Sequence, residues 1–263
     1  DVCSSDLGIA FSAEKASEAR LETHGIDGVE ALVGQPMPDI YSAEASLFVL
    51  RAGVALLEKQ MADFLYLSLT DYIQHKFAPD EPESLDFYRA LDVELSRLID
   101  TGAVVAATAD HGMNAKNLPD GSPNVIYLES ILTEQFGPGV RVICPITDPY
   151  VVHHGALGSF CTVYLSADAD EDALASKIRD LDGVLAVYTR AEGCAEFELP
   201  EDRMGDLIVI SEKHKVLGSS VASHDLSGLT EPLRSHGGIT EQRVPLLLSK
   251  PTPTLPDDRR LRN

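Results

Sequence analysis

Aspartate and histidine side chains occur together in three short segments of the chain, and their types and spacing suit metal binding. Asp71 precedes His75 by four residues, Asp110 is followed directly by His111, and His236 opens a His-Gly-Gly sequence. If the four-residue spacing lies on one helical turn, the carboxylate and the imidazole share a face and can hold one ion. Each segment alone is a weak signal, since turns and solvated surfaces contain the same residues. The three together predict a metal site.

Carboxylate and imidazole ligands favour Zn²⁺, although sites of this kind also accept manganese or iron. Asp71, His75 and His236 make a set of three ligands that leaves a fourth position open, which is the pattern of a catalytic zinc site. Asp110 and His111 offer two ligands for a second ion, and the sequence shows no obvious source for the others. We therefore expect one complete zinc site and part of another.

Two apolar runs, 64–69 and 103–109, end directly before these aspartates and are predicted to be buried strands. The segment between them reads as a helix that Ser84 caps and Gly102 ends. A strand, a helix and a second strand in this order predict a right-handed parallel crossover in an α/β sheet covered on both faces. Ligands of such sheets collect beyond the carboxyl ends of the strands, where the candidate residues stand.

The remainder of the first part of the chain is predicted to be helical around one long loop. Ser12 can cap an amphipathic helix over 12–22, and Ser42 can cap a longer helix over 43–61. Between them, glycines and prolines break the pattern over 23–41, which we expect to be mostly loop.

The sequence pattern of residues 119–204 differs from that of the preceding segment, because turn-forming residues are frequent and the predicted elements are short. This segment is predicted to be a small α+β cap inserted into the core. Its expected elements are strands at 159–165 and 183–189 and a helix at 168–181. Buried-strand patterns then return at 206–211 and 244–248. The predicted organisation is an α/β core over 8–118 and 205–263, a parallel sheet flanked by helices, interrupted by the cap.

The motifs resemble those of the alkaline phosphatase superfamily. The matching segments are Thr-Asp-Tyr-Ile-Gln-His at 70–75, Thr-Ala-Asp-His-Gly-Met at 108–113 and Ser-His-Gly-Gly at 235–238. Within the superfamily, the segments 110–116 and 145–155 look like those of the phosphonoacetate hydrolases, which are similar to nucleotide pyrophosphatase/phosphodiesterases. The resemblance covers almost all of the chain after about residue 8.

The resemblance implies a fold and a set of roles. It implies an alkaline-phosphatase-like core, with Asp71, His75 and His236 as ligands of one zinc and Asp110 and His111 as two ligands of another. It further implies two zinc ions per complete enzyme. The activity that the resemblance implies is hydrolysis of the carbon–phosphorus bond of phosphonoacetate to acetate and phosphate, through a phosphothreonine intermediate.

Other parts of the family's site have no counterpart in this sequence. The nucleophilic threonine, another aspartate ligand and two substrate-binding lysines are expected upstream of residue 8, so no catalytic nucleophile is visible here. The chain opens without methionine, and we expect it to begin inside a longer reading frame. Arg141 matches an arginine of the family and is the candidate cation for substrate binding, together with His75 and His236. A lone arginine before a strand is as commonly a solvated side chain.

Several other residues have an ordinary structural explanation that we prefer. Lys116 could reach a phosphonate, but exposed lysines near loops are common. Thr70 is more plausibly a strand-end support than a nucleophile. The remaining histidines are expected to be surface or hydrogen-bonded residues; they are His24, His153, His154, His214 and His224. A member of the 153–154 pair lining the substrate pocket is the alternative.

Composition limits the classes of partner that the chain can bind. The formal net charge of −21 disfavours nucleic-acid binding. The expected substrate, a small phosphonate, is what the resemblance implies. No apolar run approaches the roughly 18 residues that cross a membrane. The four cysteines, at 3, 144, 161 and 194, are expected to be free thiols of a cytoplasmic protein. A homodimer is an open alternative.

Two competing hypotheses stay open. The first is an enzyme with the same core that acts on a phosphodiester or pyrophosphate. The absence of tryptophan and the 6% aromatic content argue mildly against the base-stacking slot that such an enzyme would use. The second is a non-catalytic fragment that binds one zinc, or that lacks part of its sheet and aggregates through the exposed edges.

Overall fold

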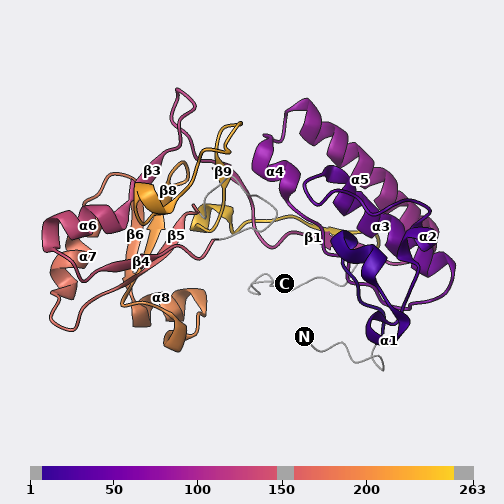
Figure 1. Ribbon diagram of the computed structural model, residues 1–263, viewed down its shortest axis with the longest axis horizontal. Helices are drawn as coiled ribbons and strands as arrows, with labels where there is room; N and C mark the ends of the chain where they lie inside the picture. Colours follow the sequence, from indigo (N-terminus) through magenta and orange to yellow (C-terminus); the bar gives the residue numbers. More distant parts are fainter. Residues whose placement is uncertain (1–7, 147–156, 252–263) are drawn as a thin grey trace. The chain divides into compact units, whose positions relative to one another are not determined.

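The computed structural model describes residues 8–146 and 157–251. Their contacts divide the chain into two compact units. The first unit runs to Thr108 and resumes at Pro245, and the second unit comprises Ala109–Val244. Figure 1 labels most of the helices and strands of both. Within the described ranges, no helix combines the length and the apolar character needed to cross a membrane.

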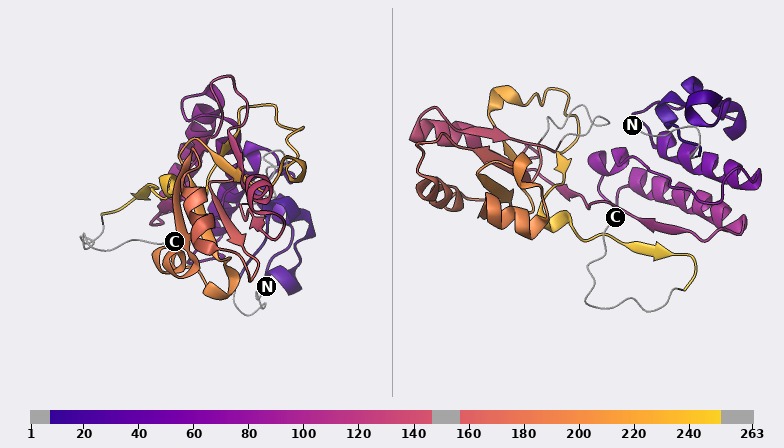
Figure 2. Two further views of the ribbon diagram at one scale, coloured as in Figure 1. Left: turned by 90° about the vertical axis from the view of Figure 1, so that its left-hand side faces the viewer. Right: turned by 90° about the horizontal axis from the view of Figure 1, so that it is seen from below.

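The first unit is mostly helical. Its elements are the 3-10 helix η1 (Ala13–Glu18), the helices α1 (Leu21–His24), α2 (Val29–Val33), α3 (Ala43–Glu58), α4 (Tyr72–Lys76) and α5 (Pro82–Asp100), and the strands β1 (Ala106–Thr108) and β10 (Leu246–Leu248). The long helices α3 and α5 lie side by side (Figure 2). Leu50 and Val54 of α3 pack there with Leu98 of α5, and all three are buried.

The long helix predicted over 43–61 is confirmed with an end at Glu58. The helix predicted over 12–22 is wrong, because the extended backbone of Arg20 separates η1 from α1. The Arg20 guanidinium donates hydrogen bonds to the carbonyls of Ser17 and Ala19, at 3.0 and 2.8 Å. A continuous helix would use those carbonyls internally.

Helix α5 begins two residues before the predicted cap. Pro82 stands in its first turn, where the missing N–H of proline costs nothing. Ser84 instead lies inside the helix, and its hydroxyl donates a hydrogen bond to the carbonyl of Phe77 at 3.4 Å. The predicted end is confirmed, since the backbone of Gly102 has a φ of +93°.

The buried strand predicted over 64–69 is wrong. Leu65 and Leu67 pack against the helical core, whereas Phe64 and Tyr66 are each 86% exposed. Side chains of this segment therefore point alternately toward the core and toward solvent. Because every residue except Ser68 is apolar, the sequence shows no alternation of polar and apolar residues. The described residues assign it no strand partner, so it is extended chain and not part of a sheet.

The apolar runs at 103–109 and 244–248 do form strands, but short and exposed ones. β1 and β10 pair antiparallel, with Ala106 opposite Leu248 and Thr108 opposite Leu246. The parallel crossover predicted between 64–69 and 103–109 is therefore wrong, and so is the predicted burial of both runs.

The second unit holds most of the strands. Its strands are β2 (Asn114–Ala115), β3 (Val125–Tyr127), β4 (Arg141–Ile143), β5 (Phe160–Tyr164), β6 (Val184–Thr189), β7 (Leu207–Ser211), β8 (Val216–Gly218) and β9 (Arg234–Ser235). Its helices are α6 (Leu128–Phe136), α7 (Glu171–Arg179), α8 (Arg190–Phe197) and the 3-10 helices η2 (Glu201–Arg203), η3 (Val221–Ser223) and η4 (Ile239–Glu241). The predicted strands at 159–165, 183–189 and 206–211 are confirmed, and the predicted helix over 168–181 is the shorter α7.

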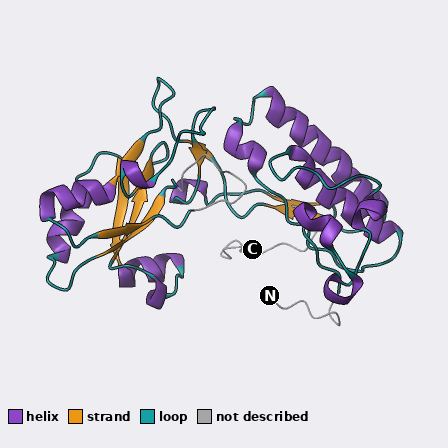
Figure 3. Ribbon diagram, in the orientation of Figure 1, coloured by secondary structure: helices purple, strands orange, loops and turns teal. Residues whose placement is uncertain are grey.

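Four strands form an antiparallel sheet in the order β4-β5-β7-β6. The central strand β7 is buried along its whole length. Leu207 and Val209 face the core that α6 and α7 cover, and Ile208 and Ile210 face the core that α8 covers. Figure 3 shows helices on both faces of this sheet. Burial on both faces explains why this strand reads as a continuous apolar run.

Smaller pairings complete the second unit. β3 and β8 run parallel, with α6 following β3 directly. β2 and β9 pair antiparallel, with Asn114 opposite Ser235. β7, predicted as a core strand, shares its sheet with the predicted cap strands β5 and β6. The division into 8–118, 119–204 and 205–263 stays a prediction.

Candidate metal centre

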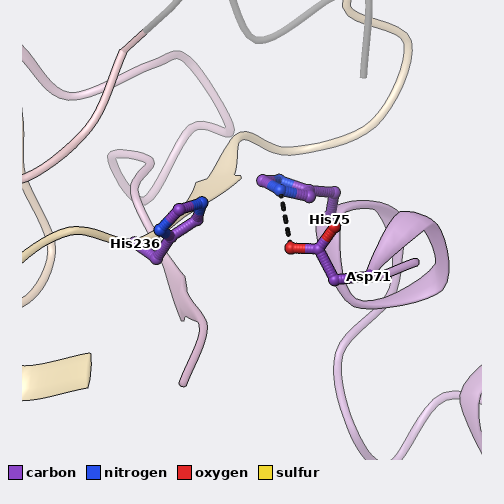
Figure 4. Close-up of side chains that lie close together, drawn as sticks. All are labelled: Asp71, His75 and His236. Carbon is purple, nitrogen blue, oxygen red and sulfur yellow. Dashed lines mark ion pairs between the residues drawn. The ribbon is translucent and has the colours of Figure 1, made fainter. Parts of the chain in front are cut away.

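Asp71 and His75 share one helical turn, as predicted. Asp71 stands at the N-terminal end of α4, and its carbonyl accepts a hydrogen bond from the backbone N–H of His75 at 3.0 Å. Nε2 of His75 lies 3.1 Å from Oδ2 of Asp71 (Figure 4). The His75 side chain is fully buried and that of Asp71 is 28% exposed. The turn is anchored by the buried side chain of Ile73, which packs with Leu47 and Phe87.

This pair fits a metal site. Ligand atoms that each lie about 2.0–2.1 Å from a tetrahedral zinc are about 3.3 Å apart, which is close to the observed 3.1 Å between the nitrogen and the oxygen. The two groups also have the right chemistry, since each residue offers one ligand atom. The third proposed ligand, His236, belongs to the second unit.

His111 and His236 are brought together within the second unit by the pairing of β2 with β9. Because Asn114 lies opposite Ser235, the residues before β2 and after β9 emerge at the same end of the ladder. The two imidazole rings stack with their centroids 3.5 Å apart and their planes 5° from parallel. The sequence gives no hint of this stacking, because 125 positions separate the two residues.

Asp110 and His111 lie next to each other, but their side chains differ in exposure. The Asp110 side chain is 81% exposed, and its Oδ1 accepts a hydrogen bond from the backbone N–H of His111 at 3.1 Å. The same oxygen lies 3.7 Å from Nε2 of His111. Nδ1 of His111 is 3.0 Å from the carbonyl of Gly112. Nε2 of His111 and Oδ1 of Asp110 are therefore close enough to serve as two ligands of one ion.

Lys116 corrects an expectation. It is fully buried, not exposed, and its Nζ lies 3.0 Å from Oε1 of Glu241, which is also buried. Burial lowers the pKa of Lys116, and the carboxylate of Glu241 only partly offsets this. Burial raises the pKa of Glu241, but hydrogen bonds from Asn114 and Thr240 and the charge of Lys116 outweigh it and leave that pKa below its ordinary value.

Glu241 was missed by the sequence analysis. Its signal is a glutamate three residues after Gly238, the spacing at which a side chain reaches back to the start of a helix. Oε2 of Glu241 accepts a hydrogen bond from the backbone N–H of Gly238 at 2.8 Å. Such a spacing is common and does not by itself identify a buried ion pair.

The remaining candidates occupy several settings. Arg141 is exposed and stands at the start of β4, so its substrate role stays a prediction. His24, His214 and His224 have hydrogen-bond partners, as expected: Arg20 N–H, the Ala115 carbonyl and Ser219 N–H, at 3.1, 3.1 and 2.8 Å. His153 and His154 lie outside the described residues.

The described cysteines are free thiols, as predicted; they are Cys144, Cys161 and Cys194. Cys3 lies outside the described residues. Burial, with a further contribution from Glu129, raises the pKa of Cys144 to about 11. Burial also raises the pKa of Cys161 well above its ordinary value.

Two solved structures are similar to the chain over nearly its whole length. Both are phosphonoacetate hydrolase from Sinorhizobium meliloti 1021, one in complex with phosphonoformate and the other with phosphonoacetate. Each is 50% identical, with a TM-score of 0.91 over 97% of this chain and 62% of that chain. The α/β fold class and the resemblance to the phosphonoacetate hydrolases are thereby confirmed.

A curated phosphonoacetate hydrolase from Penicillium oxalicum is 57% identical over 42 residues, which is 15% of this chain and 58% of that protein. The chain thus spans about 60% of the length of the relatives that it matches. The family model of type I phosphodiesterase / nucleotide pyrophosphatase matches residues 35–238, well over half of the sequence. The chain therefore belongs to the type I phosphodiesterase / nucleotide pyrophosphatase family.

Proposed function

We propose that this chain is part of a metal-dependent hydrolase that cleaves the carbon–phosphorus bond of phosphonoacetate, giving acetate and phosphate. The observation that carries the proposal is the 50% identity over 97% of the chain to a phosphonoacetate hydrolase. The motif segments at 70–75, 108–113 and 235–238 and the geometry of Asp71 with His75 support it.

Asp71, His75 and His236 are the proposed ligands of one zinc, and Asp110 and His111 are proposed ligands of a second. The separation of Asp71 and His75 suits a shared ion, and the stacked rings of His111 and His236 suit ligands of two neighbouring ions. Paired metal ions in hydrolases lie about 3.5–4 Å apart. When bound, the ions supply positive charge that lowers the pKa of a nucleophile and offsets the charge of the phosphonate.

The proposed reaction has two displacements at phosphorus. A threonine hydroxyl loses its proton, its oxygen forms a bond to phosphorus, and the phosphorus–carbon bond breaks. The departing carbon keeps the electron pair and takes a proton, which gives acetate. Water then hydrolyses the phosphothreonine, which gives phosphate and restores the hydroxyl.

Substrate binding is assigned to His75, His236 and Arg141. The carbon that leaves carries negative charge in the transition state, so a cation near the substrate carboxylate lowers the barrier. Arg141 is the candidate for this role in the second unit, and its exposure leaves its guanidinium available. The proposed partner is this small phosphonate, in a cytoplasmic enzyme. The three free thiols agree with that location, and a homodimer is a further proposal.

A second candidate function is hydrolysis of a phosphodiester or pyrophosphate. The description of the matching family model favours it. The two functions share the metal ligands and differ in the leaving group, which is a carbanion in one and an alkoxide or phosphate in the other.

NMR separates the candidates, with phosphorus spectra following phosphate and proton spectra following acetate. The chain, joined to the part of the Sinorhizobium protein that it does not cover, is incubated with zinc and either phosphonoacetate or bis(p-nitrophenyl) phosphate. We expect phosphate and acetate in equal amounts from the first, little turnover of the second, and loss of activity in Asp110→Asn. Faster turnover of the diester would favour the second candidate, and turnover of neither would overturn the proposal.

A further inference from the structure

A buried ion pair lies directly behind the loops that carry His111 and His236, and neither of its members belongs to the proposed ligand set. Lys116 follows β2 and Glu241 ends η4. Both side chains are about 1% exposed or less, and Nζ lies 3.0 Å from Oε1. The inference that follows rests on the proposed function, because it concerns the ligands named there.

Lys116 reaches the loop of His236 through one intermediary. Its Nζ donates hydrogen bonds to the hydroxyl of Ser159 at 2.6 Å and to the carbonyl of Lys213 at 2.8 Å. The backbone N–H of Ser159 donates in turn to the carbonyl of His236 at 2.8 Å. The ammonium group thus fixes the residue that holds the backbone of a proposed ligand.

Glu241 contacts both loops. Its Oε2 accepts from the N–H of Gly238, two residues after His236, at 2.8 Å. Its backbone carbonyl accepts from the N–H of Gly112, next to His111, at 2.6 Å. Its Oε1 also accepts a hydrogen bond from the side-chain amide of Asn114. One residue therefore ties together the segments on either side of the stacked rings.

The glycines of these loops show how closely the parts fit. A Cβ added to Gly238 would lie 2.8 Å from Cβ of Ser159 and 2.9 Å from Oε2 of Glu241. Gly237 has a φ of +98°, which side chains other than glycine rarely adopt. The His-Gly-Gly sequence is thus required by the approach of the loop to Ser159 and Glu241.

Stability alone is a weak reason for such a pair. Removing two charges from water costs several kcal/mol, and apolar replacements of buried ion pairs are often as stable or more so. What the pair provides in this structure is a fixed relation between two loops. Ligands of metal ions are commonly oriented by such outer groups.

We propose that Lys116 and Glu241 are positioning residues that hold the imidazoles of His111 and His236 in register for metal binding. The Glu241 carboxylate holds Gly238 beside His236, and Lys116 fixes that carboxylate in place. The backbone carbonyl of the same glutamate holds Gly112 beside His111, so a shift of Glu241 after loss of the pair changes where both rings lie. It does not remove a ligand atom.

The test compares three variants with a matched control. Lys116→Met removes the ammonium group. Glu241→Gln replaces the two carboxylate oxygens, which bind different partners, by one amide oxygen and an NH₂ group. The double variant has neither charge of the buried pair. The control is Asp206→Asn, which breaks the 2.6 Å ion pair with Arg190 in the same unit. Zinc affinity is measured by competition with a chromophoric chelator, and stability by urea unfolding.

We expect zinc affinity to fall by about 10–100-fold in all three variants, the range typical of groups that orient ligands. The double variant is expected to regain stability relative to Lys116→Met without regaining zinc affinity. Asp206→Asn is expected to keep the affinity of the parent chain. Folded variants with unchanged affinity would overturn the proposal.

A second readout needs no metal. Each of two stacked rings shifts the proton resonances of the other, so the His111 and His236 ring protons report the stacking by NMR in the metal-free chain. We expect these shifts to collapse in Glu241→Gln and to persist in Asp206→Asn. A parent chain that shows the shifts but binds no zinc would refute the proposed function and leave the positioning intact. Unchanged shifts in Glu241→Gln would refute the positioning.

Discussion

Two pairs of proposed metal ligands are held close together in different ways. One pair is Asp71 and His75 on a helical turn, and the other is His111 and His236 on two loops. In the first unit, four residues of helix place a carboxylate 3.1 Å from an imidazole, and one apolar side chain anchors the turn. In the second unit, two imidazoles far apart in sequence stack at 3.5 Å, and a buried ion pair braces the loops. Local backbone geometry suffices in one case, and long-range polar contacts are needed in the other.

The largest effect on the free energy of unfolding is expected from removing one member of the Lys116–Glu241 ion pair. Lys116→Met leaves the charge of Glu241 buried with hydrogen bonds but no counter-ion, which is expected to cost about 3–5 kcal/mol of stability. The matched control is Arg190→Met, whose partner Asp206 is partly exposed, and it is expected to cost less than about 1 kcal/mol. Urea unfolding of the two variants tests the difference, and equal losses would contradict it.

A smaller effect is expected from the anchor of the helical turn. Ile73→Ala removes a buried side chain from the contact with Leu47 and Phe87, which is expected to cost about 2–4 kcal/mol. Val93→Ala on the exposed face of α5 is the control, with a change within about 0.5 kcal/mol. If thermal unfolding found the two alike, the turn would not depend on its apolar anchor.

The pH dependence of stability tests the contribution of Glu241 in the second unit. The pKa of Glu241 is lowered in the folded chain, so its contribution is present above its ordinary pKa and is lost as the pH falls toward the folded value. Unfolding of Glu241→Gln is therefore expected to depend less steeply on pH between about 5 and 3 than that of the parent chain. Parallel pH profiles of variant and parent would contradict this assignment.

The last prediction concerns a reaction rate rather than stability, and it uses the described thiols, which all lie in the second unit. With a pKa of about 11, Cys144 is almost entirely protonated at pH 8. Its alkylation by iodoacetamide is expected to be more than about a hundredfold slower than in the unfolded chain. The experiment uses Cys3→Ser, so that mass spectrometry follows only described thiols. Fast labelling of Cys144 in the folded chain would show that this unit opens more readily than its packing indicates.

The same contrast explains what the sequence could predict. The spacing of Asp71 and His75 was enough, because a helical turn translates four residues into one face. β7 was predicted because burial on both faces leaves an unbroken apolar run. The segment at 64–69 is an equally apolar run, but one of its faces is exposed. Composition therefore could not distinguish it from a strand that is buried on both faces. Lys116 and Glu241 were beyond prediction, since their burial depends on contacts more than a hundred residues apart.

The central claim is that Asp71, His75 and His236 hold one zinc. The most direct test is metal analysis of the stripped and reloaded chain after dialysis, with His236→Ala, His75→Ala and the control His24→Ala. We predict about one tightly held zinc in the parent chain and in the control, and its loss in the other two variants. A folded parent chain that retains no zinc, or a His236→Ala variant that retains as much as the parent, would contradict the claim.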